Sequence, residues 1–138
     1  MSVQAVEKVK ALKVKDVMHK EVVTIDGSAT VAQAVALMRA RRVSSLIVNR
    51  RDHDDAWGIL VRKDVVNKVI DPSKDPDKVK VFEIMTKPVM MVSPSLALKY
   101  CARLMHQSGV RRAPVFDGKN IIGIISNTNI FNALEVKQ

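Results

Sequence analysis

The first half of this chain recurs in its second half, and this internal repeat limits the folds that the sequence can adopt. The matched positions include Val17-Met18 with Ile84-Met85, Thr24-Ile25 with Met91-Val92, Met38 with Met105, and Gly58 with Gly123. The spacing shortens by two residues after Val48, so an insertion falls in the polar segment 49–55, where a surface connection tolerates it. Because the period exceeds that of ordinary solenoid repeats, the pattern predicts two copies of one small α/β unit sharing a core, with paired clefts.

Composition agrees with a globular protein of this kind. The 138 residues are 47% hydrophobic but only 4% aromatic, so the core must be built from aliphatic side chains and methionine. Each half alone would be marginal in the surface that it could bury. The single cysteine, Cys101, is predicted to be a buried thiol, because it lies at helical spacing from Leu98 and Met105. No apolar segment has the length of a signal peptide or a membrane span, which predicts a cytoplasmic location without a membrane partner.

The net charge of +9 raises the question of nucleic-acid binding. The cations are dispersed over several predicted elements, however, and no segment alternates cations with base-stacking aromatic residues. They include Arg39, Arg41-Arg42, Arg50-Arg51, Arg62-Lys63 and Arg111-Arg112. This distribution fits a phosphate-bearing small ligand or an acidic partner about as well as DNA, so nucleic acid is not the expected partner.

Residue patterns predict the order β-α-β-β-α in each half. In the first half, we expect strands at 21–25, 45–48 and 56–61 and helices at 31–42 and 62–70. In the second half, we expect strands at 89–92, 112–116 and 120–125 and helices at 98–105 and 127–134. The segments Asp26-Gly27-Ser28 and Ser93-Pro94-Ser95 are predicted to cap the first helix of each half. The expected domains are a helical appendage at 1–13, repeats at 14–70 and 81–138, and a linker at 71–80.

In this order the chain resembles a pair of CBS domains, the regulatory repeats named after cystathionine β-synthase. The resemblance covers the chain from Val14 to about Leu134. It rests on the openings Asp16-Val17-Met18 and Glu83-Ile84-Met85-Thr86, on the segment 109–115, and on the two closing segments 58–64 and 123–129. It implies a mixed fold of helices and strands, α/β in the broad sense and α+β in the narrower one. In this fold, tandem β-α-β-β-α repeats are related by a pseudo-two-fold axis.

Each closing segment contains a glycine, two apolar residues, a position for Ser or Thr, two further residues, and an Asp or Asn. A glycine in a strand permits a planar ligand to approach the backbone closely. A hydroxyl near the following helix N-terminus favours phosphate, and a carboxylate or amide one turn later can bind ribose hydroxyls. The first copy retains Asp64 but has Val61 at the hydroxyl position, whereas the second has Ser126 and Asn129. We therefore expect two unequal sites, with the second better suited to phosphate.

The resemblance implies a set of ligand-binding positions in both copies. Adenine contacts are expected at Thr24, Ile25, Met91 and Val92, ribose contacts at Asp64 and Asn129, and a ribose or phosphate contact at Ser126. The set is completed by Gly58, Gly123, Arg111, Arg112, Pro114 and Val115, and Arg62 or Lys63 is expected to compensate for Val61. Arg112 is the favoured phosphate ligand, because guanidinium binds phosphate bidentately. The alternatives are helix capping as the only role of Asp64 and Ser126, and a solvated side chain for Arg112.

The predicted function is that of a stand-alone regulatory module, not an enzyme. It would bind adenosine-containing ligands such as AMP, ADP or ATP in the cleft between the repeats, with S-adenosylmethionine and NAD as further candidates and no obligatory cofactor. Binding would shift the populations of the protein's conformations, and a separate effector protein would recognise one of them. Members of the family commonly pair two chains, which implies a homodimer. No metal site is expected, because the acidic cluster around His53 lacks ligand spacing. The alternatives are a nucleic-acid-binding protein and a ligand-free interaction scaffold.

Overall fold

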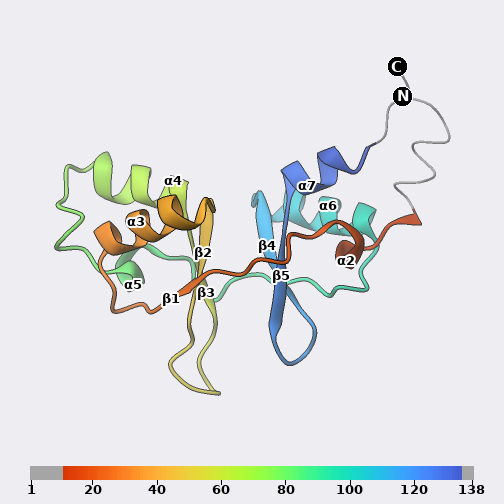
Figure 1. Ribbon diagram of the computed structural model, residues 1–138, viewed down its shortest axis with the longest axis horizontal. Helices are drawn as coiled ribbons and strands as arrows, with labels where there is room; N and C mark the ends of the chain where they lie inside the picture. Colours follow the sequence, from red (N-terminus) through yellow and green to blue (C-terminus); the bar gives the residue numbers. More distant parts are fainter. Residues whose placement is uncertain (1–10, 135–138) are drawn as a thin grey trace. The chain divides into compact units, whose positions relative to one another are not determined.

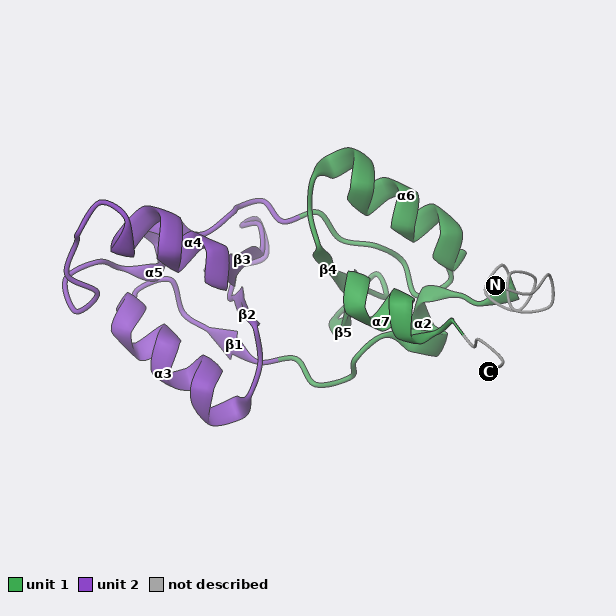
Figure 2. Cartoon of the chain, turned by 90° about the horizontal axis from the view of Figure 1, so that it is seen from above, with its two compact units in different colours: residues 1–22, 90–138 green, residues 23–89 purple. Residues whose placement is uncertain are grey.

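The chain folds into two units whose boundaries differ from those of the sequence repeats. The computed structural model describes residues 11–134. Unit 1 takes Met1–Val22 and Met90–Gln138, and unit 2 takes Val23–Val89 (Figure 2). Each unit therefore contains the opening segment of the other repeat.

Unit 2 is built on a three-stranded sheet (Figure 1). The strands are β1 (Thr24–Ile25), β2 (Ser45–Val48) and β3 (Gly58–Val61), where β1 pairs with β2 in parallel and β2 with β3 in antiparallel orientation. The helical elements are α3 (Val31–Arg41), α4 (Arg62–Val65), the π-helical turn η1 (Val66–Ile70) and α5 (Val81–Ile84). Aliphatic side chains from these elements, such as Val31, Leu46 and Leu60, form the core, as the low aromatic content predicts.

Unit 1 is built on the antiparallel pair β4 (Arg112–Phe116) and β5 (Ile121–Ser126). Its helices are α2 (Val14–Val17), α6 (Leu98–Ser108) and α7 (Asn127–Asn132). The core includes Leu98, Met105, Ile125 and the fully buried Cys101, whose thiol pKa is raised by burial. The prediction of a buried cysteine is thus confirmed. Within residues 11–134, no helix has the length and apolarity needed to cross a membrane.

The opening segments attach to the two units through the same backbone pattern. In unit 1, His19 and Ile124 exchange two backbone hydrogen bonds of 2.9 Å each. In unit 2, Thr86 and Ile59 exchange two hydrogen bonds of 2.9 and 3.0 Å. Each opening segment thereby pairs with the last strand of the neighbouring repeat, which explains why openings and closing segments recur together in the sequence.

The predicted α+β class and most of the central strands are confirmed, but two outer strands are shorter than predicted. The predicted strand 21–25 is reduced to Thr24–Ile25, and the predicted strand 89–92 to a single parallel bridge between Val92 and Val115. Both shortened segments lie where the chain passes from one unit to the other. The strands expected at 56–61 and 120–125 run from 58 to 61 and from 121 to 126.

Both predicted helix caps are wrong. Helix α3 is capped by Thr30, whose Oγ1 accepts the backbone N–H of Gln33 at 3.1 Å while Gln33 Oε1 accepts that of Thr30 at 2.9 Å. This reciprocal pair satisfies two N-terminal donors, which Ser28 could not do from its position. Helix α6 begins after Ala97, which has no side-chain cap.

Three other helix predictions differ from the structure. The segment predicted as one helix from 62 to 70 is an α-helical turn followed by a π-helical one, and the last helix ends at Asn132. The short helices α2 and α5 were not predicted. Most of the predicted appendage, residues 1–10, lies outside the described residues.

Candidate functional site

The predicted ligand-binding positions occupy matching places in the two sheets. In unit 2, Ile25 and Gly58 both pair with Val48, one from each side. In unit 1, Val92 and Gly123 both pair with Val115. The strand register therefore repeats as the sequence does, and in each unit a predicted adenine contact and the glycine of the closing segment flank the same central-strand residue.

The two glycines make room for methionine. A Cβ atom on Gly58 would lie 2.9 Å from Met85 Sδ, and one on Gly123 would lie 2.7 Å from Met18 Sδ and 2.9 Å from the His19 carbonyl oxygen. These distances are shorter than side-chain packing allows. The structure thus gives both glycines a packing role, where the sequence suggested only the close approach of a ligand.

In unit 1, the structure brings together Arg112, Ser126 and Asn129. Arg112 and Ser126 are directly opposite each other on β4 and β5, so their side chains share one face of the sheet. Ser126 Oγ donates to Asn129 Oδ1 at 2.9 Å and accepts the Asn129 backbone N–H at 3.2 Å, while the Ser126 backbone N–H donates to Asn129 Oδ1 at 3.0 Å. Ser126 therefore both caps α7 and lies opposite Arg112, while Asn129 is bonded to Ser126.

The matching end of unit 2 is charged. Asp64 is 9% exposed, and its Oδ2 accepts the Val61 backbone N–H at 3.0 Å. Its Oδ1 lies 3.3 Å from Lys68 Nζ. Val61 lies opposite Ser45 and offers no hydroxyl, so only half of the capping box forms. Sequence reasoning missed Lys68, although its i, i+4 spacing from Asp64 was the available signal.

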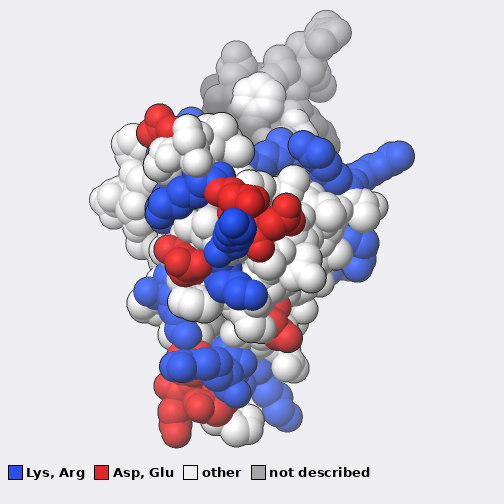
Figure 3. Space-filling model, turned by 90° about the vertical axis from the view of Figure 1, so that its left-hand side faces the viewer, with Lys and Arg blue, Asp and Glu red and all other residues white. Residues whose placement is uncertain are grey.

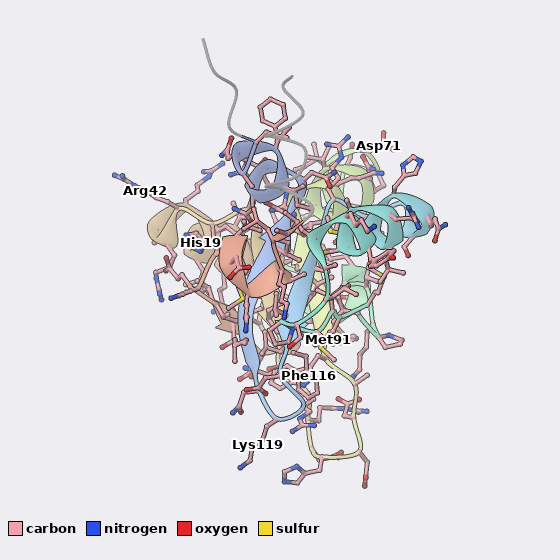
Figure 4. The ribbon with its side chains drawn as sticks, turned by 90° about the vertical axis from the view of Figure 1, so that its right-hand side faces the viewer. His19, Arg42, Asp71, Met91, Phe116 and Lys119 are labelled. Atoms are coloured by element: carbon pink, nitrogen blue, oxygen red, sulfur yellow. The ribbon has the colours of Figure 1, made fainter. Side chains whose placement is uncertain are left out.

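A cavity of about 560 Å³ lies at the other end of β4 in unit 1. It is lined by Met91, Val92, Ser93, Phe116, Asp117 and Gly118. Its volume lies in the range of small-molecule sites, and it is widely open to solvent. Figure 4 shows Met91 and Phe116 near one another, with Lys119 farther out on the same turn. Met91 and Val92 were predicted as adenine contacts, whereas the residues of the turn were not.

Asp117, in this turn, is a fixed carboxylate at the cavity. Its Oδ1 accepts the backbone N–H groups of Lys119 and Asn120 at 2.8 and 2.7 Å. These hydrogen bonds favour the ionised form and lower the pKa of Asp117. The cavity therefore combines the apolar side chains of Met91, Val92 and Phe116 with the carboxylate of Asp117 and the hydroxyl of Ser93.

In unit 2, the positions equivalent to Ser93 and Phe116 are bonded to each other. They are Asp26 and Asn49, and Asn49 Nδ2 donates to Asp26 Oδ1 at 2.9 Å. The neighbouring predicted contact Thr24 is exposed. The two units thus differ both where the closing segment meets its helix and at the opposite end of the sheet.

The remaining predicted site residues differ in their exposure to solvent. Arg111 is exposed, and its carbonyl accepts the Asn127 backbone N–H at 2.9 Å, next to the Ser126 cap. Pro114 is buried on β4, and Val115 is fully buried in the core of unit 1. The Val115 side chain therefore packs in the core. Arg62 and Lys63 are exposed on α4.

The acidic loop around His53 is organised by an ion-pair network. Asp55 lies 2.6 Å from Lys87 Nζ and 3.2 Å from Arg51 Nε. These cations and the Arg51 backbone N–H lower the pKa of Asp55. Among residues 11–134, no group of three or more His, Cys, Asp or Glu side chains is placed to hold a metal ion. Figure 3 shows cations and anions intermingled on one face of unit 2.

Comparison with known proteins gives one consistent family. A sequence model of the CBS domain matches residues 14–71 and 81–136. A CBS domain-containing protein of Bacillus subtilis is 27% identical over 82% of this chain and 79% of its own length. An uncharacterized protein of Methanopyrus kandleri is 29% identical over 88% of this chain, which spans only 62% of that relative.

Solved structures agree with this result. A hexameric CBS-CP12 protein from bloom-forming cyanobacteria is 46% identical, with a TM-score of 0.85 over 87% of this chain and 66% of that chain. A putative signal-transduction protein with CBS domains from Burkholderia ambifaria is 30% identical, with a TM-score of 0.75 over 92% of this chain and 90% of its own.

Proposed function

The chain belongs to the CBS domain family, and from this premise we propose that it is a regulatory module that binds adenosine-containing ligands such as AMP, ADP or ATP. The observation that carries the proposal is the grouping of Arg112, Ser126 and Asn129 at one end of the unit 1 sheet. A guanidinium, a hydroxyl and an amide are complementary to phosphate and ribose.

The cavity at the other end of β4 supplies an apolar environment for a base. Met91, Val92 and Phe116 contribute its apolar surface, and Asp117 contributes an acceptor for an exocyclic amine. Phe116 and Arg112 are four residues apart on one strand, a distance of about 13 Å. A nucleotide laid along β4 would therefore place its base and its phosphate at opposite ends of the same strand.

Unit 2 offers a second, different site. Asp64 supplies a carboxylate for ribose hydroxyls, and Thr24 and Ile25 supply the adenine-contact strand. The bonded pair Asp26 and Asn49 occupies the place of the unit 1 cavity walls. We therefore propose that unit 1 holds the stronger site.

The proposed signalling role is non-catalytic and involves other chains. Ligand binding would favour one of several conformations, which an effector protein would recognise. We propose a homodimer as the smallest assembly. The cyanobacterial relative is hexameric, and this chain covers only part of it. Light scattering with and without ligand measures the assembly directly.

A thermal-shift panel tests the proposal. Purified protein is heated with AMP, ADP, ATP, S-adenosylmethionine, NAD or short DNA, and positive results are followed by calorimetric titration. We expect at least one adenosine-containing ligand to raise the melting temperature. Stabilisation by DNA alone, lost steeply with added salt, would indicate the nucleic-acid alternative. Binding of nothing in the panel would favour a ligand-free scaffold.

Matched variants then locate the site. Asn129→Ala removes the proposed ribose ligand and should weaken binding about tenfold, the cost of one or two hydrogen bonds. Asn132→Ala makes the same change on an exposed residue of the same helix and should leave affinity unchanged. The double variant Asp64→Ala, Asn129→Ala should abolish measurable binding, and retained affinity would show that the ligand binds elsewhere.

A further inference from the structure

Lys68 occupies an unusual position beside the one buried charged residue among those described. Asp64 is buried in unit 2, and Lys68 Nζ lies 3.3 Å from its Oδ1. The same ammonium group donates to the carbonyl oxygen of Ile84, the last residue of α5, at 2.9 Å. Lys68 is therefore held between a carboxylate and a helix C-terminus, both of which attract a cation.

The Lys68 side chain remains accessible in this position. It is 47% exposed, whereas the Asp64 side chain is 12% exposed. Half-exposed ion pairs contribute little to stability, so stability alone gives a weak reason for this pair. Lys68 lies in the π-helical turn η1, and single π-helical turns occur frequently at functional sites.

The second repeat lacks both charges at once. The positions equivalent to Asp64 and Lys68 are Asn129 and Ala133, so a charged pair in one repeat corresponds to a neutral pair in the other. The second repeat instead has a cation on its strand, where Arg112 lies opposite Ser126, and the first repeat has Ser45 at that place. The two repeats thus place a cation beside their closing segments from different elements, Lys68 beside Asp64 and Arg112 opposite Ser126.

From this exchange we propose that Lys68 positions Asp64 and selects phosphorylated ligands at the unit 2 site. The inference rests on the proposed function. The carboxylate has one oxygen bonded to Val61 and the other paired with Lys68, and each oxygen keeps a lone pair for a ribose hydroxyl. An unpaired buried carboxylate would repel a nearby phosphate, and Lys68 compensates that charge. Adenosine, which carries no phosphate, depends on Lys68 much less.

The test uses the full chain with Asn129→Ala, which weakens the competing unit 1 site by the proposed factor of about ten. Lys68→Met is added to this parent, and affinities for adenosine, AMP and ATP are measured by calorimetry at low salt. We expect ATP to lose about tenfold in affinity and adenosine no more than about twofold, because Coulomb energy scales with ligand charge. Added salt should reduce the difference.

Two further variants separate charge from structure. Lys68→Arg keeps the positive charge and should restore most of the ATP affinity. Lys74→Met removes an exposed lysine of the same unit and should match the parent. Equal losses for adenosine and ATP, or no loss for either, would overturn the role of Lys68 while leaving the proposed function intact. Failure of the wild-type chain to bind these three ligands or any adenosine-containing member of the thermal-shift panel would reject the proposed function and this inference with it.

Discussion

Units 1 and 2 share their strand register but differ where each closing segment meets its helix. In unit 1 that junction is neutral and complete, with three hydrogen bonds between Ser126 and Asn129. In unit 2 it is charged and incomplete, with Asp64 bonded to Val61 and paired with Lys68. One framework therefore accommodates two chemistries at the same position.

The invariant part of the framework is the contact between methionine and glycine. Met18 covers Gly123 in unit 1, and Met85 covers Gly58 in unit 2. The variable part lies at the two ends of the register, where the unit 1 cavity corresponds to a bonded side-chain pair in unit 2. The two units thus differ at the positions where ligands are proposed to bind.

The largest predicted effect concerns the shared methionine–glycine contact. Gly123→Ala should destabilise the protein by about 3 kcal/mol and Gly58→Ala by about 1 kcal/mol, the range of overpacked cores. The difference arises because a Cβ added at Gly123 would meet a backbone carbonyl at 2.9 Å, whereas the nearest atom to a Cβ at Gly58 is a flexible methionine sulfur. Urea unfolding measures both free energies.

Double variants show which atom causes each clash. Met85→Ala should relieve most of the loss in Gly58→Ala, because the next contact is 3.3 Å away. Met18→Ala should relieve little in Gly123→Ala, because the His19 carbonyl remains. Equal costs and equal relief in the two units would mean that both glycines sit in equivalent packing.

A smaller effect is predicted for the caps that distinguish the units. Ser126→Ala should cost about 1 kcal/mol, the usual value of an N-cap. Val61→Thr should add about 0.5 kcal/mol by supplying the missing hydroxyl to α4 at nearly constant volume. Urea unfolding again gives both values, with Val61→Ala as the control that changes size without adding a hydroxyl. A destabilising Val61→Thr would show that unit 2 cannot accept the full cap.

The repeat made the framework predictable from sequence. The matched positions of Gly58 and Gly123 aligned the closing segments correctly, and the strands predicted at 45–48 and 112–116 coincide with β2 and β4. The segments 21–25 and 89–92 have the composition of strands, but only part of each pairs. Backbone bonds explain this, because Val89 donates to Trp57 in unit 2 and Val92 donates to Pro114 in unit 1.

The contacts of the candidate site were less predictable, because the opening segment of each repeat packs against the closing segment of the other. Nothing in the sequence indicates that Met18 packs on a glycine of the other repeat, since this contact requires the tertiary fold. Helix capping is one of the roles that the position of Ser126 in the sequence indicates, and the structure shows it. Lys68 was missed although a regular helix over 62–70 would itself bring it beside Asp64 at i, i+4 spacing.

The smallest predicted effect compares two acidic turns as pH falls. Asp55 in unit 2 and Asp117 in unit 1 both have lowered pKa values, the first through Lys87 and Arg51 and the second through backbone N–H groups. Above their unfolded pKa of 3.8, each carboxylate contributes its full stabilisation. As pH falls below that value the unfolded chain binds the proton first, so stability decreases.

Asp55→Asn and Asp117→Asn should each flatten the loss of stability between about pH 5 and about pH 2, with the larger change for Asp55. Urea unfolding at a series of pH values measures the slopes. Salt distinguishes the two turns, because screening weakens the ion pairs of Asp55 but acts less on the backbone hydrogen bonds of Asp117. At high salt the Asp55 effect should therefore shrink while the Asp117 effect persists. The same salt response for both variants would show that the two turns hold their carboxylates by one mechanism, which would remove this difference between the units.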